Sequence, residues 1–216
     1  VALRNVDVLL RLTTNLINFE RTDVYSSELF VAPYDLNTYL QDICDIFRSY
    51  AAFKHLDFTC DCNVEEGLKV WFDKEKMDSI LKNLLSNAMK YTPEYGAVGV
   101  SVQETKDTWR LEVKDTGIGI ASKEHNKLFK MHFRGANAIN SKIVGSGIGL
   151  MLARKLIRLH GGKIEVRSVE QQGTTVRIVF PKSKEHFHKF TEVAPNWDIS
   201  GDGQIEAAGL VQTEGN

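Results

Sequence analysis

Three features are scarce or missing in this sequence, and each excludes a class of protein. The formal net charge is only −1, so the chain lacks the basic field of a nucleic-acid binder, and we expect no direct contact with nucleic acid. No apolar run approaches the roughly 18 residues that cross a bilayer, and the N-terminus shows no signal-peptide pattern. Three cysteines are too few for a disulfide framework, which suits a reducing, cytoplasmic compartment.

Patterns for metal binding are also weak. Cys60 and Cys62 flank Asp61, but apolar and polar residues alternate around them, which predicts a half-buried strand with the cysteines as small core residues. A segment beginning at Asp198 starts like a calcium loop, but its twelfth position is Gly209, where such loops carry glutamate. We therefore predict no metal ion at either segment.

Hydrophobic periodicity predicts one medium-sized domain of mixed α and β structure, with extra segments on both sides. Helical spacing of apolar residues predicts helices at about 2–22, 35–53, 73–92, 122–129 and 148–160. Alternation of apolar and polar residues predicts strands at about 28–32, 56–62, 68–72, 98–102, 109–113, 163–168 and 175–180. Residues 182–216 lose this periodicity, and we expect a partly disordered tail or linker there.

The first predicted helix is amphipathic. Leu3, Val6, Leu10 and Ile17 lie on one of its sides, and such a stripe cannot be buried by a single helix. We therefore expect it to pack on another helix, in this chain or in a second one. Because the chain starts without Met inside a helical repeat, we expect it to be an excised fragment.

The third predicted helix carries a polar cluster beside its core stripe. At about 100° per residue, Asn83, Asn87 and Lys90 fall on one arc of the helix, next to the buried stripe. Two carboxamides and an ammonium group therefore converge at one edge. An ordinary solvated face is the alternative for this cluster taken alone.

Two glycine clusters follow later in the chain. The first, Asp115-Thr-Gly117-Ile-Gly119, comes after a predicted strand, and the second, 145–150, opens a predicted helix. Free N–H groups at a helix N-terminus favour anions, so the second cluster is a candidate phosphate site. It lacks the Gly-Lys-Ser/Thr ending of a P-loop, and the chain lacks the βαβ alternation of a dinucleotide fold.

Asp115 is the sharpest single candidate. Its carboxylate, at a strand end beside glycines, can accept a hydrogen bond from an exocyclic amine such as adenine N6. The alternative is an Asx-turn that stabilises its own loop. Sequence alone leaves both open.

Taken together, four motifs resemble those of the catalytic and ATP-binding domain of sensor histidine kinases, in the GHKL ATPase superfamily. They are the N box (83–93), the G1 box (115–119), the F box (128–134) and the G2 box (145–150), in that order. The resemblance covers about residues 30–181 and implies an α+β fold of two layers. One layer is a mixed, mostly antiparallel sheet, three helices cover one of its faces, and an ATP lid lies between the motifs.

The resemblance also implies how the chain is divided. Residues 1–24 are similar to the second helix of a dimerisation hairpin, as in hybrid two-component sensors. Residues 28–181 form the catalytic and ATP-binding domain, and residues 182–216 form a linker. The parent protein is then expected to be a homodimer, anchored in the bacterial inner membrane with this domain on the cytoplasmic side.

For ATP and Mg²⁺, the resemblance implies a role for each site residue. Asn87 would bind Mg²⁺ through its side-chain oxygen, Asn83 would orient the reacting groups, and Lys90 would contact phosphate. Tyr91 would pack against adenine, and Asp115 would accept from its amine. The remaining residues expected to line or close the ATP site are Gly117, Gly119, Ile120, Phe133, Arg134, Gly145, Ser146, Gly147, Ile148, Gly149, Leu150 and Thr174. Among these, Arg134 would act at the γ-phosphate, within a lid at 134–146.

The phosphoacceptor is missing from the sequence. None of the six histidines lies in a His-Glu/Asp-x-x-x-Pro context on an early helix. The resemblance therefore implies transfer of the γ-phosphoryl group to a histidine on a dimerisation helix outside this chain, and then to an aspartate of a response regulator receiver domain. The alternatives are a degenerate nucleotide-binding scaffold, or another GHKL enzyme such as a serine kinase, a topoisomerase subunit or a chaperone.

Overall fold

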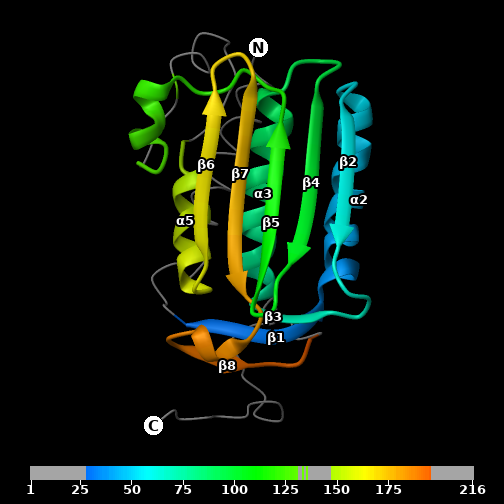
Figure 1. The fold of residues 1–216 in the computed structure, drawn as a ribbon, viewed down its shortest axis with the longest axis vertical. Coiled ribbons are helices and arrows are strands. Elements are labelled where there is room, and N and C mark those ends of the chain that lie inside the picture. The colour runs from blue at the N-terminus through cyan, green and yellow to red at the C-terminus, as the bar shows by residue number, and fades with distance from the viewer. Residues whose placement is uncertain (1–27, 131–132, 134, 136–146, 196–216) are drawn as a thin grey trace, which may run out of the picture.

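The computed structural model describes residues 28–130, 133, 135 and 147–195. A five-stranded sheet forms one layer, and three helices cover one of its faces (Figure 1). In spatial order the strands are β2 (Asp57–Asn63), β4 (Ala97–Glu104), β5 (Thr108–Asp115), β7 (Gly173–Pro181) and β6 (Lys163–Val169). Only the β2–β4 pair is parallel, so the predicted mixed, mostly antiparallel sheet is confirmed.

Two of the three helices, α2 and α3, begin directly after the predicted cap residues Asp35 and Asp73. They are α2 (Leu36–Phe53), α3 (Lys74–Tyr91) and α5 (Gly149–Leu159). The Asp35 side chain accepts from the Thr38 N–H at 2.8 Å, which satisfies a donor that the first turn of α2 leaves unpaired. The helix predicted near 122–129 forms instead as a 3-10 helix, η1 (Ser122–Lys127).

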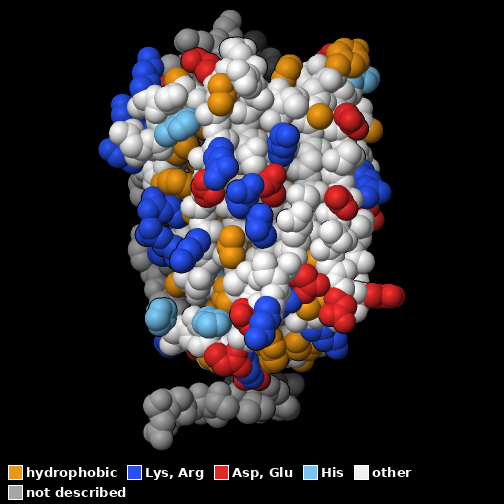
Figure 2. All heavy atoms as spheres, viewed as in Figure 1, with side chains coloured by type: hydrophobic (Ala, Val, Ile, Leu, Met, Phe, Trp, Pro, Cys, Tyr) orange, Lys and Arg blue, Asp and Glu red, His pale blue; other side chains and the backbone are white. Residues whose placement is uncertain are grey.

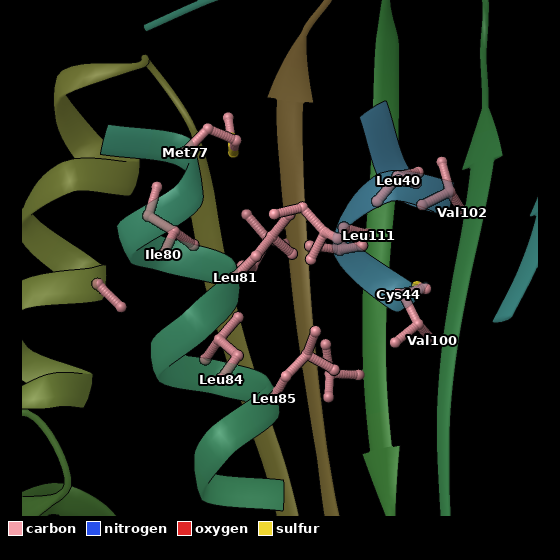
Figure 3. Packing of buried hydrophobic residues seen from close by; sticks show 14 of the residues in the cluster. Leu40, Cys44, Met77, Ile80, Leu81, Leu84, Leu85, Val100, Val102 and Leu111 are labelled. Carbon is pink, nitrogen blue, oxygen red and sulfur yellow. The ribbon is translucent and has the colours of Figure 1, made fainter. Parts of the chain in front are cut away.

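The core lies between the helices and the sheet. Leu81 and Leu85 of α3 point toward Leu111 of β5, while Leu40 of α2 faces Val102 of β4 (Figure 3). These side chains are almost fully buried. Burial of each such side chain contributes about 1.5–3 kcal/mol, so the apolar stripes recognised in the sequence are the main source of stability. No helix in the described part of the chain is long and apolar enough to cross a membrane.

A second, smaller sheet closes one end of the domain (Figure 1). Its order is β3 (Lys69–Phe72), β1 (Leu29–Asp35) and β8 (Phe190–Glu192). Because β2 and β3 belong to different sheets, the turn between them leads the chain from one sheet to the other.

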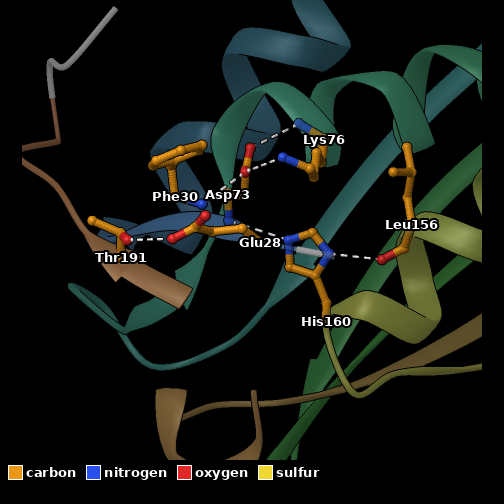
Figure 4. Close-up of polar contacts among 7 residues, drawn as sticks. All are labelled: Glu28, Phe30, Asp73, Lys76, Leu156, His160 and Thr191. Carbon is orange, nitrogen blue, oxygen red and sulfur yellow. Dashed lines mark hydrogen bonds and ion pairs between the residues drawn. The ribbon is translucent and has the colours of Figure 1, made fainter. Parts of the chain in front are cut away.

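Secondary structure continues past Pro181, where the sequence predicts a tail. A short 3-10 helix, η2 (Lys184–His186), is followed by β8, which pairs in parallel with β1. The Thr191 hydroxyl also donates to the Glu28 carboxylate at 2.8 Å (Figure 4). A three-residue strand is too short to leave a periodic pattern. The first part of the expected tail is thus folded against the domain, while residues 1–27 and 196–216 lie outside the described residues.

A buried carboxylate, Asp73, ties α3 to β1 (Figure 4). It caps α3 by accepting from the Lys76 N–H at 3.1 Å, pairs with the Lys76 ammonium at 2.7 Å, and accepts from the Phe30 N–H of β1 at 3.0 Å. Asp73 is only 2% exposed and Lys76 only 7%. Each charge is therefore compensated inside the protein rather than by water.

His160 at the end of α5 completes this cluster. Its Nε2 accepts from the Asp73 N–H at 3.1 Å, so its Nδ1 carries a proton and donates to the Leu156 carbonyl at 2.8 Å. Burial lowers the pKa of His160, which keeps the ring neutral in this arrangement. A neutral, fully bonded histidine has no free nitrogen to accept a phosphoryl group, consistent with the expectation that it is not a phosphoacceptor.

We predict that Asp73→Ala lowers the free energy of unfolding by about 3–5 kcal/mol, because it leaves the Lys76 ammonium buried and unpaired and removes a helix cap. Denaturant unfolding followed by circular dichroism measures this. Asp45→Ala is the matched control, since the Asp45–Arg48 pair is exposed at both ends and contributes at most about 1 kcal/mol. Equal losses of stability in the two variants would contradict the role of Asp73 as a stabilising buried cap and ion-pair partner.

Candidate functional site

Asp115 stands at the end of β5 with its carboxylate inside the protein. It is 9% exposed, and its Oδ1 accepts from the Gly117 N–H at 2.9 Å and the Thr174 N–H at 3.1 Å. The first bond closes an Asx-turn, which is the structural role that the sequence offered as the alternative to ligand binding. Both of these bonds end on Oδ1, and a carboxylate has a second oxygen, Oδ2, that can accept from a ligand.

Burial raises the pKa of the Asp115 carboxyl from its ordinary 3.8 to about 6, although the hydrogen bonds from Gly117 and Thr174 each lower it. Desolvation disfavours the charged form more than the two N–H groups stabilise it. A carboxyl group with this pKa is still mostly ionised at neutral pH, and it gains from any further donor that reaches it. Such a perturbed carboxyl, held at a strand end, is typical of a binding site.

Small residues at the start of β7 let this strand approach Asp115 closely. Asp115 pairs with Thr174 across β5 and β7, and Gly173 lies so close that a Cβ on it would stand 2.0 Å from the Asp115 carbonyl oxygen. The Thr174 hydroxyl is 2.9 Å from the Ser168 hydroxyl on β6. Ser168 was not predicted from the sequence, although a hairpin around Gly173 would have placed it opposite Thr174.

The G1 loop is packed between two neighbouring backbones. The Ile118 N–H donates to the Tyr91 carbonyl at the end of α3, at 3.1 Å, and a Cβ on Gly117 would stand 2.5 Å from the same oxygen. Gly119 has φ +60°, and a Cβ on it would stand 1.9 Å from the Val169 carbonyl oxygen. Both glycines are therefore required by close backbone approach.

The polar cluster of the N box lies on α3 as predicted from its spacing. Asn83 and Asn87 are one turn apart and half-buried. The Asn83 amide donates to the Ser79 carbonyl at 2.8 Å, which fixes the direction of its side-chain oxygen. The Lys90 ammonium lies 4.8 Å from the centre of the Tyr91 ring, a distance at which a cation is attracted to the ring.

The N-terminus of α5 meets this cluster. A Cβ on Gly149 would stand 2.4 Å from Asn83 Oδ1, so only glycine lets the first turn of α5 approach α3 this closely. Gly147 has φ +71°, and no side chain in the described residues caps the helix start at Ile148. The positive end of the α5 dipole thus lies beside Asn83, one turn before Asn87 on α3. An anion and its metal counterion fit this donor set, which combines N–H groups with amide oxygens.

The F box is partly described. The Phe129 ring lies 4.6 Å from the Arg154 guanidinium on α5, a contact that the sequence did not predict and that holds this loop against the helix. Phe133 is half-buried, and the His125 ring lies 3.2 Å from the Ile120 carbonyl oxygen. Leu150 packs against the core. The other predicted residues, Arg134, Gly145 and Ser146, lie outside the described residues, so their placement stays a prediction.

The sequence model of one protein family matches residues 72–184 of this chain, which is just over half of it. That family is described as "Histidine kinase-, DNA gyrase B-, and HSP90-like ATPase". The chain belongs to this family. The match spans α3, β5, α5 and β7, the elements that carry the site, and the described part is an ATP-binding domain of the histidine kinase type.

Individual relatives give the same result. The chain is 37% identical over 123 residues to the sensor histidine kinase WalK of Bacillus subtilis (strain 168), covering 56% of the chain and 20% of WalK. It is 33% identical over 176 residues to the adaptive-response sensory kinase SasA of Rippkaea orientalis (strain PCC 8801 / RF-1), covering 81% of the chain and 44% of SasA. It therefore spans less than half the length of these relatives.

A solved structure agrees in fold. The histidine kinase ThkA, crystallised in complex with response regulator protein TrrA, superposes with a TM-score of 0.67 at 25% identity, over 82% of this chain and 49% of ThkA. The expected ATPase architecture is thereby confirmed. The roles of individual site residues remain predictions, which the following variants test.

We predict that Asp115→Asn abolishes ATP binding and leaves the fold intact. The new side chain keeps an oxygen to accept from Gly117 and Thr174, but its NH₂ group meets the adenine amine with a donor in place of an acceptor. Calorimetric titration with an ATP analogue measures the affinity, and circular dichroism checks the fold. Unchanged affinity in a folded variant would overturn the adenine assignment.

We further predict that selectivity for ATP over inosine triphosphate falls as the pH falls below about 6. At neutral pH the Asp115 carboxylate favours the adenine amine roughly 10- to 100-fold, the usual value of a hydrogen bond to a charged group. At about pH 5 only about a tenth of this carboxyl remains ionised, so most of the selectivity is lost. The phosphates titrate alike in both nucleotides, so their effect cancels in the ratio of the two dissociation constants. A ratio that does not change with pH would contradict the proposed role of the Asp115 carboxylate.

Proposed function

We propose that this chain is the ATP-binding catalytic domain of a two-component sensor histidine kinase, and that it donates the γ-phosphoryl group of ATP to a histidine on a dimerisation helix of the same protein. The observation that carries the proposal is the meeting of three parts at one place. All three lie along α3: its asparagine face meets the N-terminus of α5 at Asn83, and the loop after the buried Asp115 carboxylate packs against its end at Tyr91. Each part suits a different portion of ATP.

At the adenine end, Asp115 accepts from the N6 amine through Oδ2. Thr174 stands beside it, with a hydroxyl oriented by Ser168, and reaches the adenine edge. The Tyr91 ring supplies an apolar face for the base. In the described structure Lys90 lies over that ring, so we infer that the lysine moves toward phosphate when the nucleotide enters.

At the phosphate end, the α5 N-terminus and Lys90 neutralise negative charge. Asn87 supplies a side-chain oxygen for Mg²⁺, and when bound this ion offsets the charge that develops on the transferred group. Asn83 holds its own oxygen in a fixed direction beside Gly149, and orients the reacting groups. The resemblance implies that Arg134, which lies outside the described residues, acts at the γ-phosphate. Phosphoryl transfer depends on this positioning and charge neutralisation more than on covalent help from the protein.

Two partners follow from the proposal. ThkA was crystallised with a response regulator protein, and we propose that a receiver domain takes the phosphoryl group from this protein as well. We propose that the parent protein is a homodimer, because the acceptor histidine belongs to a dimerisation domain. We also propose that it is anchored in the inner membrane, with this domain on the cytoplasmic side. A degenerate scaffold is the competing proposal, and the intact set of site residues argues against it.

We predict that Asn87→Ala weakens Mg²⁺-dependent binding of a non-hydrolysable ATP analogue at least 10- to 100-fold, the loss found when even an outer-shell partner of a bound metal is removed. Titration calorimetry with and without Mg²⁺ measures this. Ser86→Ala is the matched control, since Ser86 precedes Asn87 on α3 and is exposed. Absence of binding by the unmodified chain under both conditions would favour the scaffold.

The transfer step has its own test. The unmodified chain is incubated with radiolabelled ATP, alone and with a separately supplied dimerisation domain that carries its histidine. We expect label on the supplied domain only, with acid lability typical of phosphohistidine. Nucleotide binding without any transfer would leave the ATP site established but reject the kinase assignment.

A further inference from the structure

The five-stranded sheet carries a basic patch on the face that no helix of the described residues covers. Lys and Arg side chains gather there around two acidic ones, over the middle of β5, β7 and β6 (Figure 2). Buried residues such as Leu111 and Ile178 alternate with these side chains along the strands, so the charged ones point away from the core. The basic patch has a net charge of +3 and consists of Arg110, Glu112, Lys114, Lys163, Glu165, Arg167 and Arg177.

The strand register arranges the basic patch in three rows. In the middle row Arg177 of β7 stands between Glu112 of β5 and Glu165 of β6. Its guanidinium lies 2.7 Å from the Glu112 carboxylate and 3.9 Å from the Glu165 carboxylate. The two acidic residues of the patch are therefore already engaged by the arginine at its centre.

The outer rows supply the excess of positive charge. Thr175 separates Lys114 from Arg167 in one row, and Val179 separates Arg110 from Lys163 in the other. Arg167 pairs with Glu165 at 2.7 Å, whereas Arg110, Lys114 and Lys163 form no ion pair with any residue that the structure describes. Three cations thus remain to bind an acidic partner, on an area of about 14 by 10 Å.

A segment of the opposite charge follows the small sheet in the same chain. Residues 196–216, which we call the acidic segment, contain no lysine, arginine or histidine. Their four carboxylates are those of Asp198, Asp202, Glu206 and Glu214. Charge therefore makes the basic patch and the acidic segment complementary.

The acidic segment also starts near the basic patch. It follows β8 in the small sheet, and this sheet adjoins the large one where the Trp71 N–H donates to the Lys182 carbonyl at 3.2 Å and the Lys182 N–H donates to the Asp107 carbonyl at 3.0 Å. That end of β5 and β6 is the one nearest Arg110 and Lys163. A chain of this length can extend over roughly 70 Å, so it spans the patch easily.

We propose that the acidic segment docks on the basic patch, with its carboxylates bound by Arg110, Lys114 and Lys163. Exposed ion pairs are individually weak, but a short flexible tether gives a local concentration on the order of a millimolar. An intrinsic dissociation constant of about a millimolar is then enough to keep the segment docked about half of the time. Because the patch lies on the face opposite the helices, the docked segment leaves the nucleotide site open.

The test is carbodiimide cross-linking of the whole chain, which joins a lysine amine to a nearby carboxylate as an amide, followed by mass spectrometry. At about 0.01 M salt we expect Lys114 and Lys163 to be linked to the acidic segment more often than Lys69. Lys69 is the internal reference, since it is exposed and lies on the small sheet that also holds β8. At about 1 M salt the Debye length falls from about 30 Å to about 3 Å, and we expect the preference to disappear. Equal linking of the three lysines at low salt would overturn the proposal.

An arginine variant tests the charge while leaving every reporting lysine in place. We expect Arg110→Glu to lower the linking of Lys114 and Lys163 to the acidic segment about fivefold, the most that one exposed ion pair contributes. Arg48→Glu is the matched control, because Arg48 is an exposed arginine of α2 outside the sheet, and we expect it to change nothing. Circular dichroism checks that both variants are folded, and equal linking in the two would refute the role of the patch.

Isotope labelling separates docking within one chain from contact between two. Chains with ¹⁴N and ¹⁵N are mixed before cross-linking, and we expect each linked pair of peptides to carry a single label. Pairs of mixed label would assign the basic patch to a second copy of the chain and reject docking of its own acidic segment.

Discussion

Asp73 holds the two helices of the ATP site in a fixed relation through its carboxylate and its backbone N–H. It caps the first turn of α3, while its backbone N–H is bonded by His160 from the last turn of α5. The two helices run in opposite directions, so this buried cluster clamps one end of the pair, and the nucleotide motifs lie toward the other end (Figure 1). A charge in the core is costly unless its partners are precisely placed, and this cost selects one arrangement of α3, α5 and β1.

The site itself is defined by backbone contacts more than by side chains. Gly117, Gly119, Gly149 and Gly173 each stand where a Cβ would meet another residue at 2.5 Å or less. They bring the start of β7 against the end of β5, the loop after β5 against the ends of α3 and β6, and the start of α5 against Asn83 on α3. Asp115 therefore lies among backbone N–H groups. On the opposite face of the sheet, charged side chains gather over the middle of β5, β6 and β7 (Figure 2). There Arg177 pairs with Glu112 at 2.7 Å, which leaves the helical face as the one that forms the core.

Regular elements were predictable from the sequence because burial imposes periodicity. The three helices of the layer and the strands of the large sheet follow from apolar spacing, and the caps Asp35 and Asp73 follow from the preference of aspartate for helix starts. What could not be predicted depends on partners far away in the chain. The strand β8 pairs with β1 about 160 residues earlier, and no local pattern reports such a contact. Asp115 illustrates another limit: its Asx-turn and its open Oδ2 coexist, so the two hypotheses that the sequence left open were not alternatives.

The pairing of β1 with β8 has a mechanical consequence. The chain enters the domain through β1 and leaves it through β8, and the two strands run parallel, joined by bonds such as Val193 N–H to the Val31 carbonyl. Tension applied through the preceding and following segments pulls these strands along their length in opposite directions. The hydrogen bonds between them are then loaded together in shear, instead of being opened one after another. The pairing of β1 with the three-residue strand β8 is therefore expected to resist such a force better than a pair whose bonds open one at a time.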